Sequence, residues 1–200
     1  MPKPQHLNVK AAQIDATAEA LPAPGIYEID PPHSFAYFRA RHVVVGAVRG
    51  RFDKIAGTIT VAQDPADCSL DVSIDVSSIS TQNSMRDEDL RGAAFFDVKN
   101  FPVMTYQGRG IRSVSGKSWR MDGSLTVRGI TKTVPLHFTF LGTAASDPGK
   151  PARVAFHGSA ATKRADFSMT HELLHEIGAS SAPDVEIEID SEALAKVPAK

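Results

Sequence analysis

One stretch of the chain reads Ser69-Leu70-Asp71-Val72-Ser73-Ile74-Asp75-Val76-Ser77, and apolar and polar residues alternate along it without a break. Successive side chains of a β-strand point to opposite faces, so this period of two places every apolar side chain on one face and every polar one on the other. One face is therefore expected to contact an apolar interior and the other to contact water. The stretch predicts a strand of an antiparallel sheet that is covered on one side only.

The same alternation recurs along most of the chain from Gly25 onward. Turn signals such as Asp122-Gly123 and Asp147-Pro148-Gly149 separate the alternating segments. Many short, one-sided strands joined by turns indicate a sandwich or a barrel, and closure into a barrel leaves no exposed sheet edge. The other strands are expected near residues 26–29, 34–42, 49–52, 57–62, 105–110, 118–127, 134–140, 154–156 and 185–189.

One short helix is expected among these strands. Asn83 is suited to cap its start, and Gly92 to end it. Met85 and Leu90 are expected to point inward, while the charged residues 86–89 face water. The sequence thus predicts an all-β fold, a single antiparallel β-barrel with one short helix.

The composition limits the classes of protein that this chain can belong to. A length of 200 residues with 42% hydrophobic and 22% charged content is ordinary for one globular domain. The formal net charge of -1 gives no electrostatic reason to expect a nucleic-acid partner. No apolar run approaches the roughly 20 residues of a membrane-spanning helix, so no transmembrane segment is expected. The single cysteine, Cys68, excludes an intramolecular disulfide and a cysteine-rich metal site.

The ends of the chain are expected to be tails. Residues 1–24 are rich in alanine and proline and are expected to form a flexible N-terminal tail, followed by the barrel over 25–194 and a C-terminal tail over 195–200. No apolar core of a signal peptide is visible in residues 1–24. The protein is therefore expected in the periplasm if a leader was removed, and in the cytoplasm otherwise.

The aromatic content raises the question of what fills the barrel. The chain has ten Phe but one Trp and three Tyr, so most of its rings carry no hydrogen-bonding group. About eight strands enclose an interior that side chains can fill or that can hold one small ligand. From pattern alone, a packed core and a hydrocarbon-lined cavity both stay open.

Several short segments together resemble a known family. They are Tyr27-Glu28-Ile29-Asp30 followed by His33-Ser34, Arg86-Asp87 followed by Phe95-Phe96-Asp97, Leu125-Thr126 to Val134, and Arg164 with Asp166-Phe167. In this order they resemble the YceI-like family of bacterial polyisoprenoid-binding proteins, over about Tyr27 to Leu194. The resemblance implies a lipocalin-like barrel.

The resemblance also implies a function without catalysis and without a cofactor. The protein would hold a long isoprenoid lipid, either a polyprenyl phosphate or an isoprenoid quinone, as carrier, reservoir or sensor. The resemblance favours a location in the periplasm, and it leaves open whether the protein forms a homodimer. A phosphate head group would need charged donors at the mouth, for which His42, Arg86 and Arg164 are the candidates. The tail-binding residues are expected to be Phe38, Phe52, Val72, Ile74, Val76, Phe95, Phe96, Leu136, Phe138, Phe140, Phe156 and Phe167.

One motif points to a different class of protein. His171-Glu172-Leu173-Leu174-His175 fits H-E-x-x-H, in which two histidines bind zinc and the glutamate activates water. A small zinc-dependent hydrolase using His171, Glu172 and His175 is therefore the alternative function. The motif needs a helix of several turns, and the strand near Val185 begins too soon after it. We expect the match to be a coincidence and no metal to be bound.

Overall fold

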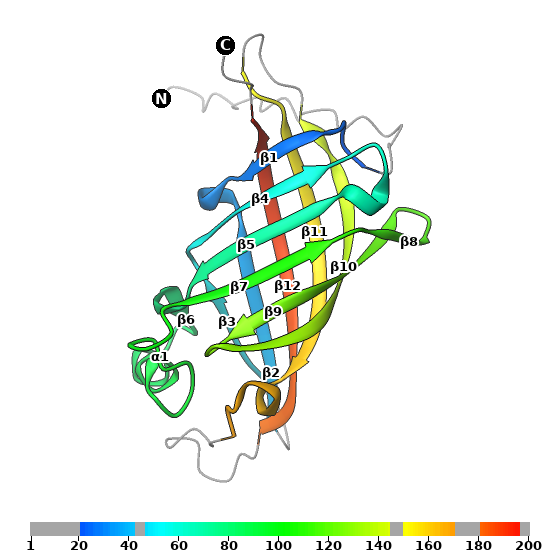
Figure 1. Ribbon diagram of the computed structural model, residues 1–200. Helices are drawn as coiled ribbons and strands as arrows, with labels where there is room; N and C mark the ends of the chain where they lie inside the picture. Colours follow the sequence, from blue (N-terminus) through cyan, green and yellow to red (C-terminus); the bar gives the residue numbers. More distant parts are fainter. Residues whose placement is uncertain (1–20, 43–46, 145–149, 171–180, 197–200) are drawn as a thin grey trace, which may run out of the picture.

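A closed antiparallel barrel forms the body of the molecule (Figure 1). The computed structural model describes residues 21–42, 47–144, 150–170 and 181–196. The sheet closes on itself because β1 pairs with β4 on one side and with β12 on the other. The predicted antiparallel barrel is confirmed. In their order around the barrel, the strands are β1 (Gly25–Ile29), β4 (Ile55–Val61), β5 (Ser69–Asp75), β7 (Val103–Arg109), β9 (Ser118–Val127), β10 (Ile130–Ala144), β11 (Arg153–Lys163) and β12 (Ser181–Ala195).

The long strand β12 carries a second branch of the sheet. Its last residues pair with β1, whereas its earlier residues, up to Asp190, pair with β2 (Phe35–His42). The branch continues through β3 (Ala47–Phe52) to β6 (Ile79–Ser80), and β8 (Arg112–Ser115) pairs separately with β9. The two short strands β6 and β8 were not predicted, because neither is long enough to show an alternation.

The register of strand pairing places alternate residues of each strand on the inside and on the outside of the barrel. Ile187 on β12 lies opposite Phe38 on β2 and Ala160 on β11, and all three line the interior. The next residue, Glu186, lies opposite Arg39, and the two side chains form an ion pair of 2.9 Å on the outer face. A register slip of one residue would exchange these two faces, so the pattern fixes the pairing.

The predicted helix is present, but two of its residues were assigned to the wrong face. Helix α1 spans Ser84–Arg91; the Asn83 side chain accepts a hydrogen bond from the Arg86 amide, and Gly92 caps the other end. Leu90 is buried as predicted, whereas Met85 is 60% exposed and Asp87 is only 7% exposed. Asp87 turns inward because it accepts hydrogen bonds from the amide (2.8 Å) and hydroxyl (2.6 Å) of Thr81. The other helices in the described ranges are 3₁₀ turns: η1 (Pro31–His33), η2 (Pro65–Asp67), η3 (Val76–Ser78) and η4 (Arg164–Phe167).

Residues on both sides of the predicted barrel boundaries contact the barrel. Pro22 is buried, and the Tyr27 hydroxyl donates a 2.7 Å hydrogen bond to the carbonyl of Ala23. At the other terminus, Ala195 still pairs with Tyr27, and the Lys196 amide donates to the Ile26 carbonyl. Contacts with the barrel are therefore present on both sides of residues 25–194.

Two clusters of buried side chains close the two ends of the barrel. The helix end, which carries α1 and η4, contains a cluster that includes Phe167 and Leu90. The termini end, where β1 meets the end of β12, contains a cluster that includes Tyr27 and Phe140. The interior between these clusters is the place where a ligand can be held.

Candidate ligand-binding cavity

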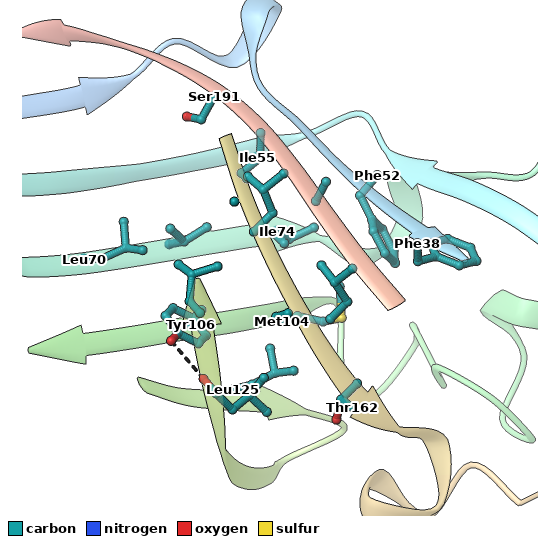
Figure 2. Close-up of a pocket in the computed structure, with 18 of the residues that line it drawn as sticks. Phe38, Phe52, Ile55, Leu70, Ile74, Met104, Tyr106, Leu125, Thr162 and Ser191 are labelled. Carbon is teal, nitrogen blue, oxygen red and sulfur yellow. Dashed lines mark hydrogen bonds between the residues drawn. The ribbon is translucent and has the colours of Figure 1, made fainter. Parts of the chain in front are cut away.

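An apolar cavity of about 270 Å³ occupies the interior of the barrel. Figure 2 shows side chains from several strands, among them Ile55, Ile74 and Met104, pointing into one shared space. The structure thus has a hollow interior, and the alternative of a completely filled core does not describe it. The predicted tail-binding residues that line the cavity are Phe38, Phe52, Val72, Ile74, Phe95, Phe96, Leu136, Phe138, Phe156 and Phe167.

Two predicted tail-binding residues lie elsewhere. Val76 is 1% exposed and belongs to the buried cluster at the helix end, and Phe140 belongs to the cluster at the termini end. Val76 departs from the alternation of β5 because the strand ends at Asp75 and η3 begins at Val76. Both residues contribute to closing the barrel, and neither is among the residues that line the cavity.

Several lining residues were not predicted. Leu21 reaches the cavity from the segment before β1, and Ile111 from the loop before β8. Neither residue belongs to an alternating segment, so no sequence signal marked them. Together they extend the lining at the termini end of the barrel.

Tyr106 is a polar residue whose hydroxyl is already occupied. It lines the cavity and donates hydrogen bonds to the carbonyls of Val134 (3.0 Å) and Met121 (3.4 Å); a hydrogen bond of Tyr106 is dashed in Figure 2. Burial is the main cause that raises the pKa of Tyr106 to about 12, so the hydroxyl stays protonated at neutral pH. Its ring therefore presents an apolar surface to the cavity.

The charged residue of the lining is Arg164. Among the residues that the structure describes, no other Lys, Arg, His, Asp or Glu lines the cavity. Arg164 begins the η4 turn at the helix end, directly after β11, and its side chain is half-buried. A guanidinium at this point gives one end of an apolar cavity a site for an anionic or hydrogen-bonding group.

Of the other two predicted head-group residues, the structure describes the side chain of Arg86 only. Arg86 donates from Nε to the Thr81 hydroxyl (2.8 Å) and from Nη2 to the Thr81 carbonyl (3.1 Å), and it is not part of the lining. Arg86 thus supports the turn before α1. The backbone of His42 ends strand β2, and its side chain lies outside the described residues, as do His171, Glu172 and His175.

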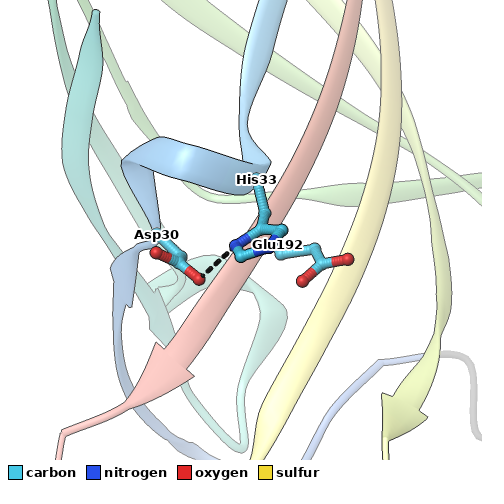
Figure 3. Close-up of side chains that lie close together, drawn as sticks. All are labelled: Asp30, His33 and Glu192. Carbon is cyan, nitrogen blue, oxygen red and sulfur yellow. Dashed lines mark hydrogen bonds and ion pairs between the residues drawn. The ribbon is translucent and has the colours of Figure 1, made fainter.

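A cluster of polar side chains lies near the start of β2, on the outside of the barrel (Figure 3). The Asp30 carboxylate accepts bonds from His33 Nδ1 (2.8 Å) and from Arg153 Nη1 (2.5 Å), and Arg153 also donates to Glu192 (2.6 Å). Asp30, His33 and Glu192 could together offer three ligands to a metal ion, but Arg153 already donates hydrogen bonds to both carboxylates. This arrangement is an ion-pair network that ties β1, β11 and β12 together.

His33 and Asp30 form the outer part of this network. The His33 side chain is 56% exposed and bonds the Asp30 carboxylate. Burial pushes the pKa of Asp30 upward, but the hydrogen bonds from Arg153 and His33 outweigh it, so the pKa is lowered overall. Asp30 is therefore ionised at neutral pH.

The fold and cavity define a class of protein: a β-barrel with an apolar interior that can enclose a hydrophobic ligand. The model of the YceI-like domain matches residues 27–193, and the chain belongs to this family. A UPF0312 protein of Pseudomonas paraeruginosa is 32% identical over 150 residues, which cover 74% of this chain and 78% of that protein. The predicted family membership is confirmed.

Solved structures share the fold. The YCEI protein of Campylobacter jejuni is 28% identical, with a TM-score of 0.64 over 78% of this chain and 90% of that one. A polyisoprenoid binding domain from Saccharophagus degradans is 17% identical, with a TM-score of 0.66 over 85% of this chain and 98% of that one. None of the helices in the described part of this chain has the length and apolar character to cross a membrane.

Proposed function

We propose that the protein binds an isoprenoid-tailed lipid, with the tail inside the barrel, and acts as a carrier, reservoir or sensor rather than as an enzyme. The observation that carries this proposal is the cavity itself, which is lined by apolar side chains from nearly every strand and, among the described residues, by one arginine at one end. A cavity of this kind recognises hydrocarbon and offers no pair of groups arranged for acid-base chemistry along its described wall. The Saccharophagus domain, which is described as polyisoprenoid binding, supports the same type of ligand.

The energetics favour a tail of several isoprene units. Burial of hydrocarbon contributes about 0.8 kcal/mol per CH₂-sized group, so each five-carbon unit contributes roughly 4 kcal/mol before costs. Ordering of the tail and loss of free motion offset part of this gain. The cavity volume of about 270 Å³ lies just below the range for small-molecule sites, roughly 300 to 1,000 Å³.

The position of Arg164 indicates how the lipid is oriented. We infer that the head group lies at the helix end, next to Arg164, and that the tail extends toward Leu21 at the termini end. A phosphate would form an ion pair and two or more charge-assisted hydrogen bonds with the guanidinium, whereas a neutral quinone carbonyl would accept a hydrogen bond without an ion pair. The same site can therefore take a polyprenyl phosphate or an isoprenoid quinone, and Arg164 discriminates between them.

Extraction of the purified protein with organic solvent, followed by mass spectrometry, tests the proposal directly. We expect a prenyl lipid in the extract, or a thermal stabilisation of the protein when a polyprenyl phosphate or an isoprenoid quinone is added. A lipid-free extract together with no thermal shift for either compound would reject the proposal.

The head group is tested by Arg164→Ala, with Lys163→Ala as the matched control. Lys163 is the neighbouring cation, is exposed, and does not line the cavity. If a phosphate is bound, Arg164→Ala should weaken its binding by roughly 1.5 to 3 kcal/mol, and added salt should weaken wild-type binding too. Calorimetry with both ligand types measures this, and equal phosphate affinity in all three proteins would remove Arg164 from the site.

A further inference from the structure

Two glycines face each other in the cavity wall, and a bulky side chain lies over each of them. Gly108 on β7 pairs directly with Gly123 on β9. A methyl carbon added at Gly123 would overlap the Tyr106 ring, and one added at Gly108 would overlap the Met121 side chain. Each large side chain thus occupies the space that the glycine on the other strand leaves free.

The Tyr106 ring consequently lies along the wall instead of across the cavity. It starts on β7, passes over Gly123 on β9, and ends at the carbonyl of Val134 on β10, to which the hydroxyl donates. Val134 pairs directly with Gly123, so these three residues form a continuous path across three neighbouring strands. The hydrogen bond holds the ring in this position, and the missing side chain at Gly123 makes the position accessible.

We propose that Tyr106 and Gly123 determine which hydrocarbon tails the cavity accepts. Prenyl tails carry a methyl branch on every fourth main-chain carbon and are wider than straight acyl tails. A ring held flat against the wall leaves the width that such branches need, while a ring displaced into the cavity would leave room only for a straight tail. The inference rests on the proposed function, and it names Tyr106 as a residue that sets specificity without bonding the head group.

The test compares geranylgeraniol with hexadecanol, the straight alcohol with the same main chain. In Gly123→Ala the added methyl group should push the Tyr106 ring into the cavity. We expect affinity for geranylgeraniol to fall by roughly tenfold or more, and affinity for hexadecanol to change by less than about threefold. Gly25→Ala is the matched control, because a methyl carbon there meets Tyr27 at an ordinary 3.7 Å and the residue does not line the cavity.

Two further variants keep the inference testable if Gly123→Ala folds poorly. Tyr106→Phe keeps the ring but removes its bond to Val134, so a smaller loss in the same direction is expected. In the double variant Gly123→Ala, Tyr106→Ala, the ring is gone and geranylgeraniol binding should recover. Circular dichroism and thermal unfolding verify that each variant is folded.

The outcomes separate this inference from the proposed function. Wild-type protein that binds no prenyl compound would contradict the proposed function itself. Wild-type protein that binds geranylgeraniol, with equal losses for both alcohols in Gly123→Ala or no loss at all, would contradict only the role of Tyr106 and Gly123.

Discussion

Replacement of Ile74 by Asp tests whether the barrel interior is as apolar as the structure indicates. Ile74 lies on β5 opposite Ile55 and Met104 and points into the cavity. It packs against the cluster at the helix end and against a further buried cluster of Ile29, Ala36 and Ile55. A carboxyl group at this position would meet hydrocarbon from neighbouring strands. Both folding and lipid binding should therefore suffer.

The magnitude follows from the partial burial of this side chain. Complete burial of an isoleucine contributes about 1.5 to 3 kcal/mol, and the partly buried Ile74 contributes the larger part of that, about 1 to 2 kcal/mol. A protonated carboxyl group without a hydrogen-bond partner costs about 1 to 3 kcal/mol in a protein interior, and the ionised form costs more. The free energy of unfolding should fall by about 2 to 4 kcal/mol, a large share of the typical 5 to 15 kcal/mol.

The loss should also depend on pH. Burial would raise the pKa of the introduced carboxyl group above its unfolded value of about 3.9, so the folded state would bind more protons than the unfolded state. The stability deficit relative to wild type is therefore smallest below the unfolded pKa of about 3.9 and grows as the pH rises through the raised folded pKa. Urea unfolding at several pH values, followed by circular dichroism, measures this dependence.

Ser73→Asp is the matched control for Ile74→Asp. Ser73 is the adjacent residue of β5, is exposed on the outer face, and does not line the cavity. The same charge there should change the free energy of unfolding by less than about 1 kcal/mol. Equal losses in the two variants, or full binding of a prenyl lipid by Ile74→Asp, would refute an apolar interior at this position.

Three further predictions concern the stability of the barrel. Asp30→Asn should lower the free energy of unfolding by about 1 to 2 kcal/mol at neutral pH, because Arg153 loses a charged partner. The pKa of Asp30 is lowered in the folded state, so the contribution of Asp30 to stability is present above its unfolded pKa and is lost as the pH falls through its folded pKa. Urea unfolding of Asp30→Asn should therefore show a smaller loss of stability relative to wild type at pH 3 than at pH 7. An equal loss at both pH values would contradict this. Asp87→Ala leaves Thr81 without its acceptor and should cost about 2 to 3 kcal/mol, with faster hydrogen exchange at the Thr81 amide; unchanged exchange would argue against the bond. Phe167→Ala should cost about 3 to 5 kcal/mol in urea unfolding, since the ring is 1% exposed, and a loss below 1 kcal/mol would show that the helix end is loosely packed.

The strands and their faces could be predicted from the sequence because alternation is a local signal. Leu70, Val72 and Ile74 face the interior as the pattern of β5 requires. The signal fails where regular structure stops: Val76 continues the alternation in sequence, but it lies in a 3₁₀ turn and packs into an end cluster. Met85 shows the same limit, since a helix of two turns gives too short a pattern to assign its faces.

Contacts between distant parts of the chain could not be predicted from single residues. Asp87 resembles a solvated residue of an acidic helix, and only the fold brings Thr81 to it. Asp30 and Arg153 are 123 positions apart, and no local pattern connects them. Arg86 and Arg164 looked equivalent as candidates for the head group, yet the structure places Arg164 on the cavity and Arg86 on a backbone turn.

Whether the barrel is hollow depends on which residues lie opposite each other on neighbouring strands, and the alternation along one strand does not show this. An inward-facing aromatic residue fills the interior if it points across the barrel, and leaves it open if it lies against the wall. The second arrangement requires a small residue on the neighbouring strand at the right register. Gly123 provides this for Tyr106, and Gly50 provides it for Phe38, since an added methyl carbon at either glycine would overlap the ring. The glycines of the wall therefore contribute as much as its phenylalanines to keeping the barrel hollow. The register of strand pairing determines which aromatic ring each glycine accommodates.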